Sequence, residues 1–254
     1  MFTFRSCRAC IIAITFYMRI HRIGIIPGPF FLQKQSAGFA FMNKINYNDE
    51  MKKEIAGGSG EKKKLLLHSC CGPCSTAVIE RLEPFFDITV FYFNPNITES
   101  EEYNLRLNEQ KRFIAEAYGD KIKIIEGRYK SVEFFLKAEG LQKEPEGGKR
   151  CEMCFAMRLF ETAKTAKEKE FDYFCSTLSV SPHKNAEIIN SIGEKLCKEF
   201  GVKYLVNDFK KENGYKRSVE LSEKYELYRQ RYCGCIYSKY ANLPGLEETD
   251  EPQT

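Results

Sequence analysis

The stretch that decides the fold of this chain is KLLLHSCCGPCSTAVIERL, residues 64–82. Its first five residues form a short, largely apolar run that predicts a buried strand, and residues 75–82 have the apolar spacing of a helix. Three cysteines fall between the two, within residues 70–74. A motif that directly follows a parallel strand lies where α/β sheets bind their ligands. This stretch therefore predicts both the start of a sheet and its chemically active edge.

The rest of the chain repeats the alternation of strand and helix. Strands are expected at 64–68, 88–93, 121–125, 171–177 and 203–206, and helices at 75–82, 103–118, 132–138, 154–168, 186–200 and 218–231. Strands that alternate with helices of this length favour right-handed crossovers and a parallel sheet covered on both sides. We therefore expect a doubly wound α/β domain, Rossmann-like or HUP-like, with a mostly parallel sheet and helices on both faces.

The excess positive charge lies at the start of the chain. The formal net charge is +4, but residues 1–41 hold five basic residues and no acid, which leaves 34 basic and 35 acidic residues beyond them. This start resembles a poor signal peptide or an organellar transit peptide, and we favour a dispensable leader ahead of Met42. Further along we expect a flexible linker at 42–61, one catalytic domain at 62–240 and a disordered acidic tail at 241–254.

Composition excludes two classes of protein. With 43% hydrophobic and 29% charged residues, the chain is no disordered polyelectrolyte. It also has no run of roughly 20 apolar residues, the length that a membrane-spanning helix needs. The 11 cysteines are more than an intracellular protein needs for packing and an odd number for a secreted disulfide framework.

Seven of the cysteines form three clusters, namely Cys70, Cys71 and Cys74; Cys151 and Cys154; and Cys233 and Cys235. We expect Gly72 and Pro73 to set a tight non-helical turn, from which adjacent thiolates can reach one point. The second cluster is a CxxC at the expected start of a helix, where the helix N-terminus and neighbouring basic residues should lower the thiol pKa. The isolated cysteines of the domain, Cys175 and Cys197, are expected to pack in the core.

Two kinds of metal site fit the first two clusters. Four cysteines can close a tetrahedral zinc site, whereas a vicinal cysteine pair at an active-site turn suits a larger cofactor such as a [4Fe–4S] cluster. Cys74 then remains close enough to touch the cofactor or a second metal. The third cluster, with Gly234 between its cysteines, suits either a labile redox pair or a CxC metal knuckle. These reduced thiols indicate a cytoplasmic protein.

Five strings occur together and in order: HSCCGPCST at 68–76, FNPNI at 93–97, RCEMCFAMRLFETAKTAKE at 150–168, STLSVSPHKN at 176–185 and YRQRYCGCIYS at 228–238. Over about residues 63–239 the chain resembles the QueH-type epoxyqueuosine reductases. The resemblance implies that epoxyqueuosine at the tRNA wobble position is reduced to queuosine, the last step of queuosine biosynthesis. It also implies an electron donor as a partner.

The resemblance assigns roles to the cysteines. It implies that Cys70, Cys71, Cys151 and Cys154 hold a [4Fe–4S] cluster, and that Cys233 and Cys235 form a redox-active disulfide. Some relatives resemble this chain but have an aspartate at the position of Cys74, which is associated with a second, mononuclear iron. Cys74 is accordingly a candidate ligand of such an iron. The sequence singles out no proton donor among His68, Tyr92, Glu152 and His183.

Basic and tyrosine residues alternate at 210–232, beside the third cysteine cluster. Cations bind phosphates and aromatic rings stack on unpaired bases, so this segment is a candidate for tRNA contact. The candidate residues are Lys216, Arg217, Tyr228, Arg229 and Arg231. A solvated amphipathic helix with inward-facing tyrosines would give the same pattern, because several glutamates are interspersed.

Two other functions compete with the reductase. One is an ATP-dependent tRNA thiolase of the pyrophosphatase-loop type, which needs a phosphate loop rich in serine and glycine after the first strand. Residues 69–75, SCCGPCS, contain one glycine and one proline, so that loop is absent. The other is a zinc-stapled RNA-binding module without catalysis, which metal analysis distinguishes from an iron–sulfur enzyme.

Overall fold

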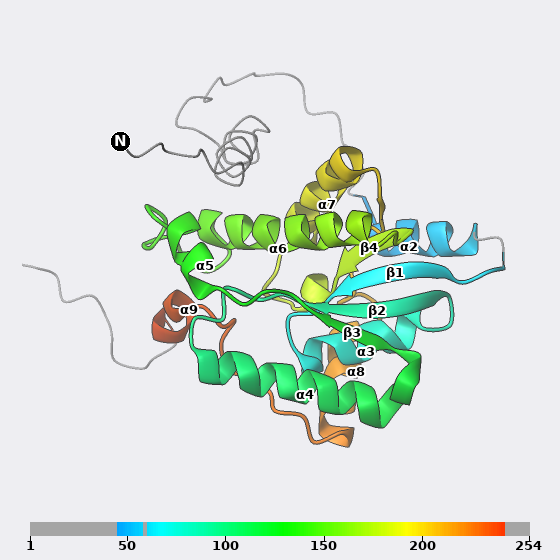
Figure 1. Ribbon diagram of the computed structural model, residues 1–254, viewed down its shortest axis with the longest axis horizontal. Coiled ribbons are helices and arrows are strands. Elements are labelled where there is room, and N and C mark those ends of the chain that lie inside the picture. The colour runs from blue at the N-terminus through cyan, green and yellow to red at the C-terminus, as the bar shows by residue number, and fades with distance from the viewer. Residues whose placement is uncertain (1–44, 58–59, 242–254) are drawn as a thin grey trace, which may run out of the picture. The chain divides into compact units, whose positions relative to one another are not determined.

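The protein is described here by a computed structural model that covers residues 45–57 and 60–241. Its centre is a parallel sheet with the strand order β3-β2-β1-β4-β5 (Figure 1). The strands are β1 (Lys63–His68), β2 (Phe86–Tyr92), β3 (Lys123–Glu126), β4 (Tyr173–Ser176) and β5 (Lys203–Tyr204). The sheet grows from β1 in both directions, which confirms the doubly wound α/β fold. The leader at 1–41 and the tail beyond residue 241 lie outside the described residues.

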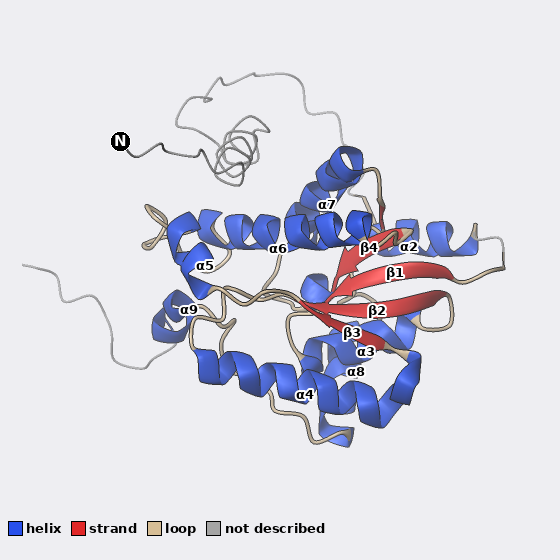
Figure 2. Cartoon of the chain, viewed as in Figure 1, coloured by secondary structure: helices blue, strands red, loops and turns tan. Residues whose placement is uncertain are grey.

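Helices cover both faces of the sheet (Figure 2). One face carries α3 (Gly72–Leu82), α4 (Ser100–Tyr118) and α8 (Gly214–Lys224), and the other carries α6 (Lys149–Glu168) and α7 (Ala186–Phe200). The short helices α5 (Ser131–Lys137) and α9 (Ile236–Ala241) lie on the side toward which the strands point. None of the helices within residues 45–57 and 60–241 combines the length and the hydropathy of a membrane span.

The central position of the first strand explains the apolar run that follows its two lysines. Leu65, Leu66 and Leu67 of β1 are fully buried, because β1 pairs with β2 on one side and β4 on the other and both faces are covered. Since β1 and β4 are the strands on either side of the change in direction, the sheet's switch point lies between them. The turn after β1, with the first cysteine cluster, therefore opens at the place expected for a ligand.

The stretch expected to be a flexible linker differs from that expectation. Helix α2 (Tyr47–Ala56) occupies most of 42–61, with Asn46 as its N-cap. One face of α2 is anchored to the domain, because Met51 is only 1% exposed and the Tyr173 hydroxyl donates a 2.5 Å hydrogen bond to Glu54. The helix is polar on average and buries Met51 alone among its apolar residues, so the sequence pattern did not reveal it.

The helix expected at 218–231 is wrong at its C-terminal end, because α8 ends at Lys224. Glu226 adopts the left-handed conformation with φ 47°, which stops the helix, and the Leu227 amide donates back to the Ser222 carbonyl. Residues 225–235 then form an irregular segment that we call the strap; it carries Cys233 and Cys235. The amphipathic pattern continues into the strap, so periodicity alone did not reveal the end of the helix.

The packing of α7 on β5 yields a stability prediction. A Cβ at Gly193 would overlap the ring of Tyr204, which is itself buried against the helix. We expect Gly193→Ala to lower the free energy of unfolding by about 1–3 kcal/mol, the usual cost of overpacking. Urea denaturation followed by circular dichroism measures this change.

Gly57→Ala is the matched control, since Gly57 has φ −76° and the nearest atom to an added Cβ is 3.5 Å away. This control should keep or slightly raise stability. Equal stability of the two variants would contradict the close approach of Gly193 to Tyr204.

Candidate metal and redox site

The turn between β1 and α3 gathers the first three cysteines. The ligand atoms of Cys70, Cys71 and Cys74 lie within 4.8 Å of one another, and the Sγ atoms of Cys70 and Cys71 are 3.9 Å apart. Cys71 is the extended N-cap of α3, whereas Gly72 and Pro73 belong to its first turn. The expected non-helical turn at Gly72 and Pro73 is therefore wrong, because proline fits the start of a helix, where it has no amide to satisfy. Three sulfurs so close together can hold a metal ion.

Neighbouring polar groups hold these sulfurs in place. The Thr177 hydroxyl accepts a hydrogen bond from the Cys70 amide and lies 3.5 Å from its Sγ. From the strap, the side-chain amide of Gln230 donates through Nε2 to Cys71 Sγ at 3.0 Å. Hydrogen bonds from Cys71 and Cys74 lower the pKa of Cys70, and the hydrogen bond with Cys70 raises the pKa of Cys71 to about 12. One thiol of the group thus loses its proton first.

A second group of sulfurs comes from α6 and the strap. Cys151, Cys154, Cys233 and Cys235 line one small gap of about 10 Å³. The Gly147 amide donates to Cys151 Sγ at 3.2 Å. Burial raises the pKa of both α6 thiols, that of Cys154 to about 12. The expected lowering of these pKa values is wrong for the free thiols, because burial outweighs the nearby positive charges.

Two cations face both groups of sulfurs. Arg158, on α6, is 1% exposed, and its Nε donates to the Cys154 carbonyl at 3.4 Å. Its Nη2 has no hydrogen-bond partner within residues 45–57 and 60–241. Burial lowers the pKa of Arg158, but the thiols, led by Cys154 and Cys233, raise it further than burial lowers it. The half-buried Lys184 behaves likewise, with Cys233 and Cys70 as its main thiol neighbours.

Arg158 pairs with no carboxylate among the residues that the structure describes. A buried guanidinium without a counter-charge is unfavourable by several kcal/mol, so this position requires negative charge nearby. Thiolates that bind a metal would supply that charge. Cys70, Cys151, Cys154 and Cys233 are the electrostatic neighbours of this cation, which is therefore suited to a metal–thiolate centre.

A larger cavity of about 350 Å³ adjoins the sulfur groups. Cys74 and Cys233 line it, and Cys233 also lines the small gap, so this cysteine borders both spaces. Six of the other lining residues are basic or aromatic, against one acidic residue, Glu146; the six are His183, Lys184, Tyr215, Arg229, Arg231 and Tyr232. The cavity can thus hold an aromatic, anionic ligand next to reactive sulfur.

The cavity divides the residues expected to contact tRNA. Arg229 and Arg231 line it, whereas Lys216, Arg217 and Tyr228 lie outside its lining. Arg217 forms ion pairs with Glu80 and Glu220, and the Tyr228 hydroxyl donates to Glu102. The structure therefore brings only two of the five candidates to the cysteines.

Three of the four possible proton donors lie outside the cavity lining. His68 is buried, with Nδ1 2.8 Å from the Ser176 hydroxyl and Nε2 3.1 Å from the Phe93 carbonyl. Burial lowers the pKa of His68 to about 3, so the ring is neutral and braces the end of β1. Tyr92 is buried and donates to the Tyr103 carbonyl, and Glu152 is exposed. Only His183 lines the cavity.

Sequence reasoning missed Arg158, Lys184 and Gln230. Arg158 was detectable, since Cys151, Cys154 and Arg158 follow the spacing of one helix face. Gln230 and Lys184 lie on irregular segments, where spacing carries no such information.

Comparison with known proteins gives a consistent match. The sequence model described as "Epoxyqueuosine reductase QueH" matches residues 65–241. A protein of that name from Streptococcus pyogenes serotype M1 is 42% identical over 85% of this chain and 86% of its own length. Another from Staphylococcus epidermidis is 44% identical over 77% of this chain and 85% of its own length. A third, from Thermotoga maritima, is 33% identical over 68% of this chain and 89% of its own length.

The charge of Arg158 yields a prediction on metal binding. We expect Arg158→Met to weaken metal affinity about 10- to 100-fold, as changes around metal ligands commonly do. Titration with Co²⁺, followed through thiolate–metal absorption and chelator competition, measures the affinity. The fold should survive, because the change leaves no carboxylate unpaired.

Arg128→Met serves as control, since Arg128 pairs with Glu133 at the surface. The same affinity in both variants would show that Arg158 does not support a metal.

Proposed function

The chain belongs to the epoxyqueuosine reductase QueH family, and on that basis we propose that it reduces epoxyqueuosine in tRNA to queuosine. The observation that carries the proposal is the position of Cys233, which lines both the cavity that Cys74 also lines and the gap that Cys151 and Cys154 line. Removal of the epoxide oxygen breaks two C–O bonds, forms an alkene and releases water. This change consumes two electrons and two protons, so the site must supply both.

We propose that Cys70, Cys71, Cys151 and Cys154 hold a [4Fe–4S] cluster. The donor set fits, because such a cluster takes four thiolates and the resulting centre carries net negative charge. Arg158 offers the matching positive charge, with a buried Nη2 that no other group in the described part of the chain binds. When bound, the cluster supplies single-electron transfer. Thr177, Gln230 and the Gly147 amide orient the sulfurs through the contacts described above.

We propose that Cys233 and Cys235 are the redox-active pair. Their oxidation to a disulfide releases two electrons and two protons, which matches the demand of the reaction. Cys233 borders both the cavity and the gap lined by Cys151 and Cys154, so it lies between the proposed substrate and cluster positions. An external electron donor must then reduce the disulfide before the next turnover.

We propose that Cys74 is a ligand of a second iron beside the cluster. Its Sγ lies with those of Cys70 and Cys71 and faces the cavity, where an iron with an open position can act as a Lewis acid. Unchanged iron content and turnover in Cys74→Ala would remove this role.

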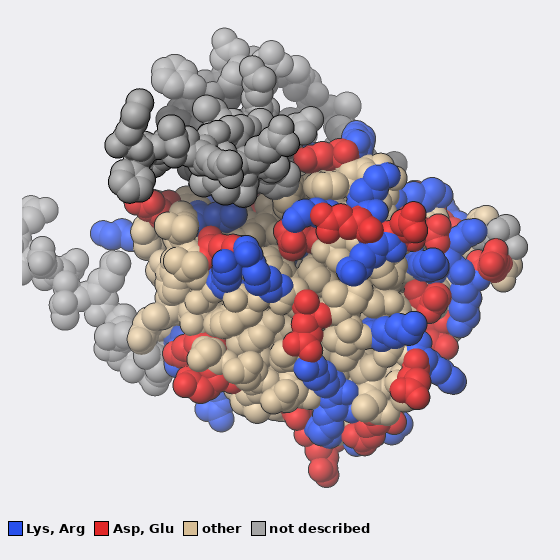
Figure 3. All heavy atoms as spheres, viewed as in Figure 1, with Lys and Arg blue, Asp and Glu red and all other residues tan. Residues whose placement is uncertain are grey.

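We propose that the modified base enters the cavity and that Arg229 and Arg231 contact phosphates at its edge. Tyr215 and Tyr232 supply aromatic surface in the same lining. On the face shown in Figure 3, the described basic and acidic residues are interspersed, so a general basic patch there does not explain binding. Lys216, Arg217 and Tyr228 have weaker support, because they lie outside the lining and two of them bind carboxylates within the chain. Arg229 also has internal hydrogen bonds, but to the uncharged Ser218 carbonyl and Ser222 hydroxyl.

The competing functions are less consistent with these observations. A thiolase of the pyrophosphatase-loop type needs a phosphate-binding loop after β1, where this chain has its cysteine turn. A zinc-stapled RNA module gives no reason for a cavity lined by Cys74 and Cys233. Iron and sulfide in protein purified without oxygen, against zinc in colourless protein, separates the module from the enzyme.

We expect the full-length protein, purified without oxygen and given a reductant, to convert epoxyqueuosine-containing tRNA to queuosine-containing tRNA. Nucleoside mass spectrometry measures the conversion. Cys233→Ala should abolish multiple turnovers while leaving the iron content unchanged, because Cys233 is outside the proposed ligand set. Cys175→Ala, at a buried cysteine of β4, is the control. Persistence of the epoxide with an intact cluster would refute the proposal.

We expect the double reversal Arg229→Glu and Arg231→Glu to weaken tRNA binding and make it less dependent on salt. The slope of log affinity against log salt should fall by about 1.4, from roughly 0.7 for each lost contact with a single strand. Filter binding at several salt concentrations measures the slope. Reversal of Arg128 and Lys164, which are outside the cavity lining, gives a control with the same change of charge. Equal slopes for the two double variants would place Arg229 and Arg231 outside the interface.

A further inference from the structure

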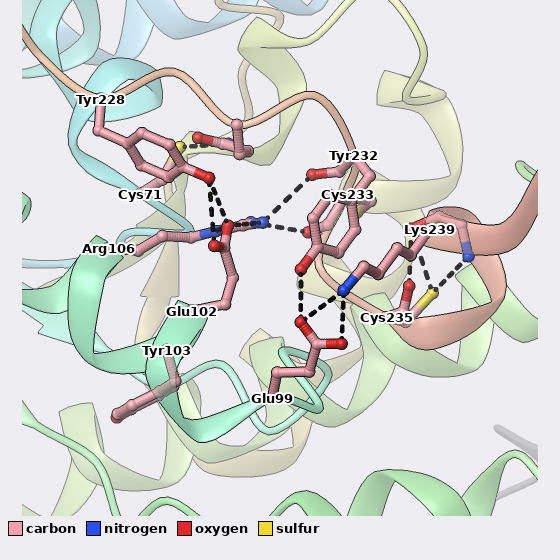
Figure 4. A network of polar contacts seen from close by, with 12 residues as sticks. Cys71, Glu99, Glu102, Tyr103, Arg106, Tyr228, Tyr232, Cys233, Cys235 and Lys239 are labelled. Atoms are coloured by element: carbon pink, nitrogen blue, oxygen red, sulfur yellow. Dashed lines mark hydrogen bonds and ion pairs between the residues drawn. The ribbon is translucent and has the colours of Figure 1, made fainter. Parts of the chain in front are cut away.

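A polar network joins the strap to α4 (Figure 4). Arg106 of α4 lies at its centre, and its guanidinium points toward the backbone that carries Cys233. Glu102, one helical turn earlier, and Glu99, the N-cap of α4, complete the helix side of the network. None of these three residues has a role in the chemistry proposed above.

Each nitrogen of the Arg106 guanidinium donates a hydrogen bond. Nη1 donates to the Cys233 carbonyl at 3.2 Å, and Nη2 donates to the Tyr232 carbonyl at 3.4 Å. Nε donates to Glu102 at 2.7 Å, and the cation lies 5.1 Å from the centre of the Tyr232 ring. The side chain is 1% exposed, so these contacts are shielded from water. Among the side chains, only the planar guanidinium of arginine has enough N–H donors to bind two carbonyls and a carboxylate at the same time.

The strap is also fixed on both sides of this contact. Before it, the Tyr228 hydroxyl donates to Glu102 at 3.1 Å. After it, Lys239 of α9 forms an ion pair with Glu99 at 2.6 Å. Gly234 fits between these anchors with φ +122°, and an added Cβ would lie 3.1 Å from Arg106 Nη1. The glycine of the CGC motif thus allows the backbone to approach Arg106.

We propose that Arg106 is the positioning residue of the Cys233–Cys235 pair. By binding the carbonyls of Tyr232 and Cys233, it keeps Cys233 at the border between the cavity and the sulfur gap. This role rests on the proposed function, because it assigns significance to the position of a redox pair. Arg106 has an electrostatic interaction with the Cys71 thiol, but its contacts with the Cys233–Cys235 pair are made through the backbone of the strap.

Arg106→Lys tests the proposal, since lysine keeps the positive charge but cannot bind the carbonyls of Tyr232 and Cys233 with two separate nitrogens. In the metal-loaded enzyme without oxygen, we expect alkylation of Cys233 by iodoacetamide to accelerate about tenfold, as the released strap opens more often. Cys197, half-buried in α7, is the internal reference for mass spectrometry. We also expect kcat to fall about 10- to 100-fold, the loss that misplacement by an ångström can cause, with KM for tRNA within about twofold.

Arg112→Lys is a matched control on the same helix. Arg112 Nη2 donates to the carbonyls of Tyr225 and Glu226 at 3.0 and 3.1 Å, at the far end of the strap from Cys233. This control should change neither the alkylation of Cys233 nor kcat. If Arg106→Lys does not fold, Glu102→Gln replaces it, because this variant weakens the ion pair that holds Arg106. We then expect alkylation of Cys233 about threefold faster and kcat about threefold lower than in the wild type.

Two results would overturn the proposal: alkylation of Cys233 within about twofold of the wild type, or equal effects of Arg106→Lys and Arg112→Lys. A fall in kcat accompanied only by lower iron content and Tm, without faster alkylation, would likewise leave Arg106 a purely structural residue. Alkylation does not depend on turnover. A wild-type protein that fails to reduce epoxyqueuosine would therefore refute the proposed function and still allow the positioning role to be measured.

Discussion

The structure depends on a buried guanidinium that faces sulfur atoms instead of a carboxylate. Arg158 lies in the protein interior, and its electrostatic neighbours include cysteines of all three clusters. A buried cation of this kind is stable only with negative charge close by. The thiols, whose pKa values burial raises, in turn need positive charge or a metal to become thiolates. Cation and sulfurs are therefore more stable together than apart, which ties the packing around α6 to the ionisation of these thiols.

Topology brings the partners of Arg158 together from distant parts of the sequence. The sheet's switch point separates β1 and β4, so the turn after β1 meets the end of β4, where Thr177 contacts Cys70. Helix α6 begins on the same side as the strands end, and places Cys151 and Cys154 there (Figure 1). The strap supplies the third set. A doubly wound sheet thus offers one edge to three segments, each with its own pair or triplet of cysteines.

The sheet and its covering helices could be predicted because apolar periodicity reflects burial directly. Buried charge gives no such signal: Arg158 looks like the polar face of an amphipathic helix, and its environment depends on α6 packing near two other segments. The end of α8 was missed because the backbone at Glu226 takes a left-handed conformation without glycine or proline, while Arg112 binds the carbonyls of Tyr225 and Glu226. The thiol pKa values were misjudged for the same reason, because burial is a tertiary property.

The two cysteines of the strap are not equivalent, and the network around Arg106 explains why. Cys235 is buried at the start of α9, where its Sγ lies 3.4 Å from the Ser238 amide and its carbonyl accepts from Ser238 and Lys239. Cys233 is half-buried and lines the cavity as well as the gap. Because α9 fixes one cysteine and Arg106 fixes the backbone of the other, only the side chain of Cys233 is placed to meet a ligand. In the proposed pair, Cys233 therefore meets the substrate side and Cys235 serves as its internal partner.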